Sequence, residues 1–327
     1  MKKTYLLRPY QPGDEKEIVP LLQKVFKGWP SFDLSCTPLD HWQWKYLDPP
    51  FETQIVVGVY DDRIIGCYHR HFPKIKVGNS ILTGTIGIDL AVHEDFRKSG
   101  VSNEMIDFLI RRDEEVGPHI NHFFTGHPML VKSYEKRYPR FPQPVTSLVW
   151  INDIDLDLRM RSADRPWAKK IGFEGLRLMN ALKNLLRVEP PLYGDLRIQE
   201  VSVFDERFDR FRAGIEDDYA FILARPRAYL NWRYADQRGG DYVVKAAESE
   251  GRVLGFIVLR SNAIRKEYPV GYIMDLLTVP ERPEVASALV ADAVRHFDET
   301  GVNLVNFWCC KNGPYTRIFS SNGFLVP

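Results

Sequence analysis

One short loop holds the residues of this chain that are best suited to chemistry, in the order Arg97-Lys98-Ser99-Gly100-Val101-Ser102. A turn that leads at once into a helix leaves several backbone N–H groups unpaired at the positive end of the helix dipole. Gly100 lets an anion approach the backbone without a β-carbon in the way. The two basic residues add positive charge, and the two serines add hydroxyl donors. The loop is therefore a candidate site for a phosphate or pyrophosphate group.

The segments on either side of this loop are predicted to be a strand and a helix. Residues 81–92 form an apolar run rich in β-branched side chains, which favours a strand that ends just before the loop. Apolar residues recur at helical spacing from Val101 to Leu109, and Gly117-Pro118 should end that helix. A single glycine at such a junction also fits an ordinary turn that caps a helix. The surrounding sequence has to decide between these two interpretations.

Upstream of the loop, the pattern predicts a helix and then a β-hairpin. Asp14 and Glu17 have the spacing of a capping box, and an apolar helical stripe follows them. Residues 54–60 and 64–71 are rich in β-branched side chains and flank the turn Asp61-Asp62-Arg63, which is typical of a hairpin. The remaining predicted elements of this half are strands at residues 75–77 and 122–125 and a short helix at residues 131–137.

The second half of the chain repeats motifs of the first half in the same order. Trp44-Lys45-Tyr46 returns as Trp232-Arg233-Tyr234, and Asp89-Leu90-Ala91-Val92 returns as Asp275-Leu276-Leu277-Thr278-Val279. The hairpin turn at residues 61–66 returns at 250–255, and the helix that follows returns at 285–299. An ordered repeat of this kind predicts two similar domains. We place them at residues 1–158 and 196–327, joined by a basic helical linker at residues 159–195.

Size and composition fit a soluble globular protein with two hydrophobic cores. The 327 residues are 44% hydrophobic, and 44 basic and 43 acidic side chains give a formal net charge of +1. This balance gives no reason to expect nucleic acid or an anionic membrane as a partner. The four cysteines form no C-x-x-C pair, no apolar stretch approaches a membrane span, and the N-terminal apolar run is too short for a signal peptide. We expect a cytoplasmic protein with no membrane span.

The stretch from Ile88 to Ser102 resembles the acetyl-CoA motif of the GCN5-related N-acetyltransferases, the GNAT superfamily. In that family a strand ending in an apolar-x-Val step is followed by an aromatic residue and then by Arg/Gln-x-x-Gly-x-Gly/Ala, which opens a helix. Phe96 fills the aromatic position, and Arg97 and Gly100 fill the loop. Ser102 replaces the last Gly or Ala, and His93 stands where the family often has proline.

Two further stretches extend the resemblance. Leu7-Arg8-Pro9-Tyr10 with Asp14 is similar to the family's first strand and helix. Residues 133–141 are similar to its late Tyr-x-x-x-Gly-Phe element, although Pro139-Arg140 stands where glycine is expected. The resemblance implies an α/β fold of two tandem GNAT-like domains, each a twisted mixed sheet flanked by helices. The second domain is expected to bind no cofactor, because its loop lacks glycine and has Glu281 and Glu284 where a pyrophosphate would lie.

The resemblance also implies roles for the residues around the loop. The backbone of Leu90 and Val92 would bind the pantetheine arm of acetyl-CoA, and a backbone N–H near Val92 is the family's usual oxyanion donor. Tyr134, or with less support Tyr138, would protonate the departing thiolate, while the alternative for either tyrosine is a half-buried packing role. The pyrophosphate would be held by the amides of Arg97, Lys98, Ser99, Gly100, Val101 and Ser102.

Two residues are candidates for the base that takes a proton from the acceptor. Asp89 places a carboxylate on an otherwise apolar strand, which is unusual unless the group is paired or functional. A structural hydrogen bond is the alternative, and Asp275 at the same place in the second half fits either interpretation. His127 is the second candidate, because the pKa of a histidine suits proton transfer near neutrality.

Two other groups of residues have a functional and a structural interpretation. His69 and His71 share a face of a predicted strand, but no third ligand accompanies them, so we expect a surface-facing pair and no metal site. Aromatic residues at repeated positions could line an acceptor pocket, although such residues more often belong to the core. These residues are Trp42, Trp44, Trp232 and Tyr234.

The leading hypothesis is transfer of an acetyl group from acetyl-CoA to a primary amine of a small molecule. The sequence identifies neither the acceptor nor the oligomeric state. The alternatives are transfer to a hydroxyl or of a longer acyl chain, aminoacyl transfer from a tRNA, and a non-catalytic acyl-CoA-binding or scaffold module. The intact loop argues against the aminoacyl donor. The scaffold alternative predicts that Asp89, His127 and Tyr134 do not converge on one cleft.

Overall fold

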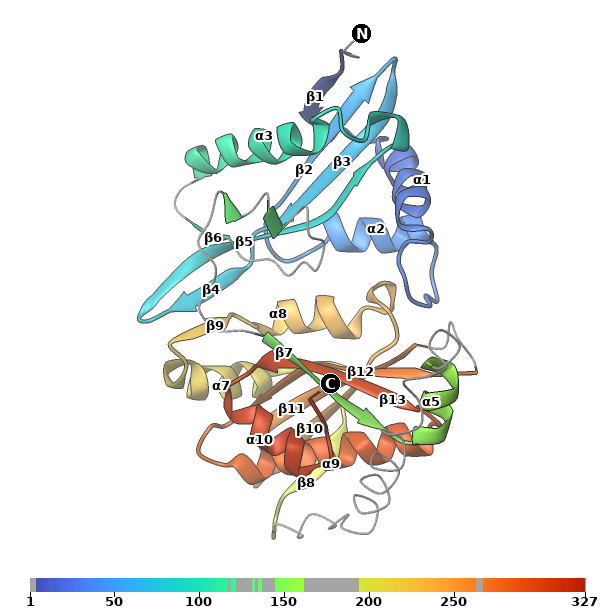
Figure 1. Cartoon of the computed structure of the whole chain (residues 1–327). Helices are drawn as coiled ribbons and strands as arrows, with labels where there is room; N and C mark the ends of the chain where they lie inside the picture. The colour runs from blue at the N-terminus through green and yellow to red at the C-terminus, as the bar shows by residue number, and fades with distance from the viewer. Residues whose placement is uncertain are drawn as a thin grey trace. The chain divides into compact units, whose positions relative to one another are not determined.

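The computed structural model describes residues 4–116, 119–121, 131–132, 135–136, 145–161, 194–262 and 267–326. The chain divides into two compact units. The first unit combines residues 1–139 with residues 212–240, and the second combines residues 140–211 with residues 241–327. Each unit is built around one β-sheet (Figure 1).

The sheet of the first unit has, among the described strands, the order β1-β2-β3-β5-β4-β9, with β6 also beside β5. All these pairs are antiparallel except β5 with β6, which is parallel. The strands are β1 (Leu6–Pro9), β2 (Thr53–Tyr60), β3 (Arg63–His71), β4 (Lys74–Val77), β5 (Ser80–Val92), β6 (His119–Asn121) and β9 (Phe221–Leu223). The helical elements are α1 (Glu15–Phe26), α2 (Pro38–Tyr46), η1 (Glu94–Phe96), α3 (Val101–Val116), η3 (Glu216–Asp218), α8 (Arg227–Leu230), the π-helical turn η4 (Asn231–Ala235) and η5 (Gln237–Gly239).

Helices cover both faces of this sheet, because side chains on β2 alternate between two hydrophobic cores. Ile55 and Val57 pack with residues of α1 and α2. Val56, between them, packs with residues of α3 on the opposite face. The strands that lead to the loop are therefore buried from both sides, which fixes the register of the sheet.

The sheet of the second unit has the order β7-β13-β12-β11-β10-β8 among the described strands. The pair β12 with β13 is parallel, and the other pairs are antiparallel. One hydrophobic core joins this sheet to α9 and α10. The elements are β7 (Val145–Ile151), α5 (Ile154–Arg161), β8 (Arg197–Glu200), α7 (Glu206–Ile215), β10 (Val243–Ser249), β11 (Arg252–Asn262), β12 (Val270–Thr278), α9 (Pro283–Glu299), β13 (Leu304–Cys310) and α10 (Pro314–Ser321).

The observed elements confirm the predicted fold class, a mixed sheet flanked by helices in each half of the chain. The helix after Asp14 is present, but the predicted capping box is not, because the Asp14 carboxylate binds the Arg8 guanidinium at 2.7 Å. The amphipathic helix α3 also begins at Val101, where the sequence placed it. Among the described helices, none is long and apolar enough to cross a membrane.

The two compact units do not follow the predicted division at residues 158 and 196. Strand β7 lies before that division but pairs with β13 in the second sheet. Strand β9 lies after it but pairs with β4 in the first sheet. Such pairings join segments far apart in sequence, so a boundary drawn from local composition does not detect them. Of the predicted linker, residues 162–193 lie outside the described residues.

Candidate functional site

Strand β5 contains a β-bulge immediately before the loop. Across the β3–β5 pair, Cys67 faces Ala91 and His69 faces Ile88, so two residues of β5 lie opposite the single residue Tyr68. One of these two, Asp89, has a φ of 48°, in the left-handed region that residues other than glycine rarely adopt. A bulge of this kind bends a strand and changes the direction of the groups that follow it.

The bulged part of β5 has one free edge among the described strands. β6 pairs only with residues 83–85 of β5, whereas β3 pairs with residues 86–92 along the other edge. The edge of residues 86–92 that faces away from β3 thus has no strand partner in the described part of the chain. A strand edge that no described strand covers is of the kind that can bind an extended, amide-containing ligand through its backbone donors and acceptors.

In the loop at residues 97–102, backbone amides that donate a hydrogen bond alternate with amides that donate none to the described backbone. The amides of Arg97, Ser99 and Val101 donate to Glu94 O at 3.2 Å, to Phe96 O at 3.2 Å and to Ser99 Oγ at 3.4 Å. Within the described residues, the other three amides of the loop make no backbone hydrogen bond. These belong to Lys98, Gly100 and Ser102.

Two left-handed residues give the loop this form. Lys98 has a φ of 70° and Gly100 a φ of 98°, and successive turns of this kind direct neighbouring amides to one side. The side chains of Arg97 and Lys98 are exposed. The Ser99 hydroxyl, which we expected to contact the anion, donates to Phe96 O at 2.7 Å and so stabilises the loop itself. The loop therefore fits an anion through three amides and two cations.

The Asp89 carboxylate lies at the centre of a buried polar cluster. It accepts hydrogen bonds from Trp29 Nε1 at 3.0 Å, from Lys45 Nζ at 2.8 Å and from the Tyr46 hydroxyl. Burial alone would raise the pKa of Asp89, but the Lys45 ammonium and the hydrogen bonds outweigh it and hold that pKa well below its usual range. The group is a carboxylate at every physiological pH, and hence a weak base.

His69 continues this cluster in a single tautomer. Its Nδ1–H donates to Asp89 O at 3.2 Å, and its Nε2 accepts from Trp42 Nε1, also at 3.2 Å, because an indole nitrogen only donates. His71 donates from Nε2 to Lys45 O at 2.8 Å. Burial lowers the pKa of His69 to about 4 and that of His71 to about 3, so both rings are neutral near pH 7.

The expectation of a surface-facing histidine pair was wrong. His69 and His71 share a face, as predicted, but their exposed fractions are 0% and 6%. The reason is that β3 lies between β2 and β5 and that the Tyr46 ring of α2 stacks on His69, with the centroids 4.0 Å apart. In the described part of the chain, no group of His, Cys, Asp and Glu residues could hold a metal ion.

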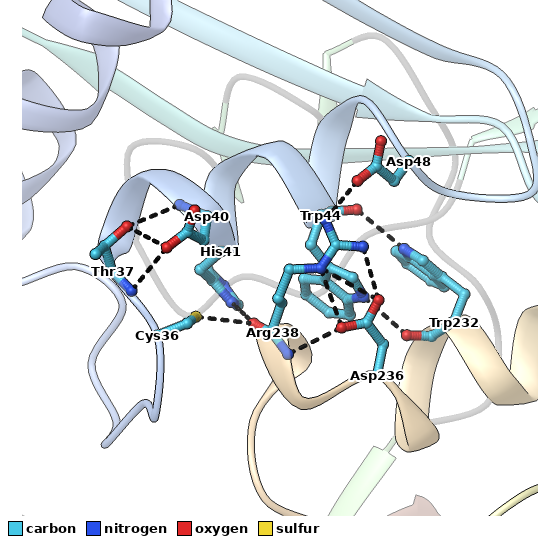
Figure 2. A network of polar contacts seen from close by, with 9 residues as sticks. All are labelled: Cys36, Thr37, Asp40, His41, Trp44, Asp48, Trp232, Asp236 and Arg238. Carbon is cyan, nitrogen blue, oxygen red and sulfur yellow. Dashed lines mark hydrogen bonds and ion pairs between the residues drawn. The ribbon is translucent and has the colours of Figure 1, made fainter.

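The two copies of the repeated tryptophan motif meet inside the first unit (Figure 2). Trp44 Nε1 donates to Trp232 O at 2.8 Å, and Trp232 Nε1 donates to Trp44 O at 3.0 Å. The two indole rings stack, with their centroids 4.9 Å apart. Arg238 joins Asp48 at 2.6 Å and Asp236 at 2.7 Å, the residues four positions after each tryptophan. We call this reciprocal arrangement of Trp44 and Trp232 the tryptophan pair.

The aromatic residues considered as a possible acceptor pocket are mostly core residues. Trp42 and Trp44 are completely buried, and Tyr234 is 7% exposed. Trp232 is half-buried and belongs to the tryptophan pair. The core interpretation therefore holds for Trp42, Trp44 and Tyr234.

The corresponding region of the second unit has a bulge in β12 and a paired carboxylate at the start of α9. Across β11–β12, Val258 faces Asp275 and Leu259 faces Ile273, so β12 has an extra residue at the matching place. Before α9, however, Arg282 Nε pairs with Glu284 Oε1 at 2.7 Å. A carboxylate lies at the start of this helix, where an anion would otherwise bind.

The structure places some predicted site residues together and leaves others outside its description. Leu90, Val92 and the six loop residues form one continuous segment. Asp89 precedes them at the bulge. Three predicted site residues, His127, Tyr134 and Tyr138, lie outside the described residues. The sequence did not connect Asp89 with its partners, although the repeated motif Trp44-Lys45-Tyr46 contains two of them, Lys45 and Tyr46.

No protein-family model and no curated protein sequence matches the chain. Solved structures are similar to it in fold. A probable N-acyltransferase of unknown function from Enterococcus faecalis V583 is 12% identical with a TM-score of 0.63, over 95% of this chain and 66% of that one. A GCN5-related N-acetyltransferase from Anabaena variabilis is 10% identical with a TM-score of 0.65, over 99% of this chain and 70% of that one.

A Saccharomyces cerevisiae N-myristoyltransferase with bound myristoyl-CoA is 13% identical with a TM-score of 0.63, and the match covers 100% of this chain and 77% of that one. This chain spans 66% to 77% of the length of these three proteins, so each contains further sequence without a counterpart here. The chain has the fold that GCN5-related N-acetyltransferases and N-myristoyltransferases share.

Proposed function

We propose that this chain is an acyl-CoA-dependent acyltransferase, with acetyl-CoA as its donor and a primary amine of a small molecule as its acceptor. The observation that carries the proposal is the order along the chain of the β5 edge, which has no partner among the described strands, the short η1 turn and the loop at residues 97–102. A strand edge can bind the two amides of a pantetheine arm, and an anion site shortly after it can bind the attached pyrophosphate.

The strand and the loop would bind different parts of the acetyl-CoA donor. The backbone of Leu90 and Val92 would bind pantetheine, and the amides of Lys98, Gly100 and Ser102 would bind the pyrophosphate. Arg97 and Lys98, together with the α3 dipole, would neutralise its charge. The thioester carbonyl would then lie near Val92, where a backbone N–H can stabilise the tetrahedral oxyanion.

The geometry around Asp89 changes the assignment of the base. A carboxylate that already accepts from Trp29, Lys45 and Tyr46, and whose pKa is lowered, is poorly suited to accept another proton near neutrality. We therefore propose His127 as the base and keep Tyr134, with Tyr138 as the alternative, as the acid that protonates the departing thiolate.

The second unit is proposed to be a degenerate copy that binds no acyl-CoA. The strand order β8-β10-β11-β12 followed by parallel β13 matches β1-β2-β3-β5 followed by parallel β6, which supports duplication of one domain. The Arg282–Glu284 pair at the start of α9 supports loss of the anion site in that copy.

Calorimetric titration tests the donor site directly. Acetyl-CoA, myristoyl-CoA, coenzyme A and dephospho-coenzyme A would be titrated into the wild type and into Gly100→Glu. We expect acetyl-CoA to bind the wild type and to lose at least about tenfold in affinity in the variant, because a carboxylate would replace the pyrophosphate. Tighter binding of myristoyl-CoA would reject acetyl-CoA as the preferred donor.

Gly251→Glu provides the matched control. Gly251 has a φ of 74°, and a β-carbon there would have nothing within 4 Å, so its substitution carries similar backbone strain in a hairpin turn of the second unit. At Gly100, with a φ of 98°, the nearest atom would be Glu104 Oε1 at 3.6 Å. Equal affinity of both variants for acetyl-CoA, or no binding to the wild type, would reject the donor site.

One observation favours a non-catalytic acyl-CoA-binding module as a second candidate. Asp89 was one of three side chains proposed for proton transfer, and its carboxylate oxygen Oδ2 accepts from Trp29, Lys45 and Tyr46. A binding module would retain the loop and lack turnover. Titration that shows binding, followed by an amine-library screen that shows no acetylated product, would support this candidate over the enzyme.

A further inference from the structure

Asp89 combines a strained backbone with an unusually complete set of side-chain partners. The other described residues besides glycine with positive φ lie in turns, loops or helix ends, at Lys27, Asp61, Asp62, Lys98 and Glu250. Asp89 is the one that lies inside a β-strand. Such a conformation persists only where the surrounding structure determines it.

Contacts from three parts of the first unit hold Asp89 in this conformation. Trp29 follows α1, Lys45 and Tyr46 belong to α2, and all three donate to the carboxylate. His69 on β3 holds the carbonyl of the same residue, at 3.2 Å. His69 is in turn fixed by Trp42 of α2, through its second ring nitrogen. Both polar ends of one residue are therefore anchored to α2 and β3.

The charges of this cluster are balanced within it. Lys45 and Asp89 are 23% and 18% exposed, respectively, at their side chains and lie 2.8 Å apart. The Lys45 ammonium also lies over the rings of Trp29 and Tyr46, at 5.6 and 5.4 Å from their centroids. The pair thus fixes the bulge without adding net charge beside the strand that follows.

The free edge of β5 gives this anchoring a functional consequence. Among the described strands, residues 90–92 pair with β3 alone. Their direction depends on the bulge, and the bulge depends on the contacts of Asp89. In the proposed function, the backbone groups of residues 90–92 bind the pantetheine arm and stabilise the oxyanion.

We infer that Asp89 is a positioning residue, whose anchored carboxylate holds the β5 bulge and thereby aims the backbone of residues 90–92 at the thioester of the donor. This role rests on the proposed function. It differs from that of a general base, because the carboxylate neither gains nor loses a proton during the reaction. It also differs from general support of the fold, because it acts on the acyl group and leaves the pyrophosphate site unchanged.

Hydrogen–deuterium exchange tests the anchoring without any ligand. We expect the amides of residues 90–92 to exchange about tenfold faster in Asp89→Ala than in the wild type, because the bulge loses its anchor. Asp89→Asn keeps an acceptor for Trp29 and Tyr46 and should fall between the two. Asp62→Ala is the control, since Asp62 has a φ of 57° in a hairpin turn. Unchanged exchange of residues 90–92 in Asp89→Ala would overturn the inference.

Titration of the same variants tests the link to the donor. 3′-Phosphoadenosine 5′-diphosphate has the pyrophosphate but neither the pantetheine arm nor a thioester, whereas acetyl-CoA has all three. We expect Asp89→Ala to bind 3′-phosphoadenosine 5′-diphosphate as the wild type does and to bind acetyl-CoA about tenfold more weakly, with Asp89→Asn restoring part of the loss. An equal loss for both ligands would indicate general disruption and overturn the inference. If the wild type binds neither ligand, the proposed function fails, while the exchange measurement still decides whether Asp89 anchors the bulge.

Discussion

At the scale of single residues, the Lys45–Asp89 pair differs in kind from the ion pairs on the surface of the same unit. Its two side chains are mostly buried, whereas Lys24 and Glu94, 2.8 Å apart, are 54% and 57% exposed. Exposed pairs contribute little to stability, because water solvates each charge almost as well as its partner does. Removal of one member of a buried pair leaves the other charge without compensation.

Lys45→Met should therefore destabilise the protein much more than Lys24→Met. For Lys45→Met we expect the free energy of unfolding at pH 7 to fall by about 3 kcal/mol, because the Asp89 carboxylate loses its counter-ion in a buried site. For Lys24→Met we expect a change below about 1 kcal/mol. Urea denaturation followed by circular dichroism measures both. Similar losses in the two variants would mean that the Asp89 cluster has no special share in stability.

At the scale of elements, the tryptophan pair ties residues 231–239 to α2 within the first unit. Trp44 is completely buried, and hydrogen bonds at the indole nitrogens of both tryptophans fix the two rings. Gly239 lies against the Trp44 ring, and a β-carbon at Gly239 would be 2.6 Å from Trp44 Cζ2. A ring held in this way cannot move aside without loss of its hydrogen bonds and packing.

Gly239→Ala is accordingly expected to lower the free energy of unfolding by about 1 to 3 kcal/mol, the usual effect of overpacking in a core. Gly214→Ala serves as the control, because Gly214 lies in α7 and a β-carbon there would meet no atom within 4 Å. Alanine should be neutral or stabilising at that helical position, by up to about 1 kcal/mol. The same urea denaturation compares them. A neutral Gly239→Ala would mean that Trp44 yields readily and that the tryptophan pair is loose.

The same elements mark the limit of what the sequence could predict. Hydrophobic period and turn residues are local signals, so β2, β3, β5 and α3 were predicted within one or two residues of their observed bounds. Strand partners depend on contacts between distant segments, which is why the sequence analysis did not predict the pairing of β7 with β13 or of β9 with β4. The loop was recognised from its glycine and basic residues, whereas the donors to Asp89 come from α2 and the segment before it, and no spacing rule connects them.

At the scale of the whole molecule, the two units share part of their strand order and differ in the segment that leads into the following helix. The order β1-β2-β3-β5 with parallel β6 corresponds to β8-β10-β11-β12 with parallel β13. Each unit also has a bulge, at Asp89 in the first and beside Asp275 in the second. Packing tolerates many substitutions that preserve volume and pattern. Pro283 removes an amide donor and Glu284 adds a carboxylate at the start of α9, which supports the proposal that the second unit binds no acyl-CoA.

Another property of the whole molecule follows from three buried histidines of the first unit. Burial lowers the pKa of His41 to about 4, that of His69 to about 4 and that of His71 to about 3, from an ordinary value of 6.5. In the unfolded chain these rings bind protons below about pH 6.5, whereas in the folded protein they remain neutral down to about pH 4. The unfolded state thus binds more protons in this window, and stability must fall as the pH decreases through it.

Each of these histidines should lower the free energy of unfolding by up to about 1.4 kcal/mol per pH unit between pH 6.5 and pH 5. Most carboxylates titrate below that range, so the histidines dominate the slope there. Urea denaturation at pH 7.5, 6.0 and 5.0 measures it, and His71→Gln should reduce the slope by about one histidine's share, since glutamine keeps a donor for Lys45 O and does not titrate. A stability that is constant from pH 7.5 to pH 5.0 would mean that these rings accept protons in the folded protein. The polar cluster around Asp89 would then open to water under mild acid, and the anchor that we propose for the β5 bulge would be lost with it.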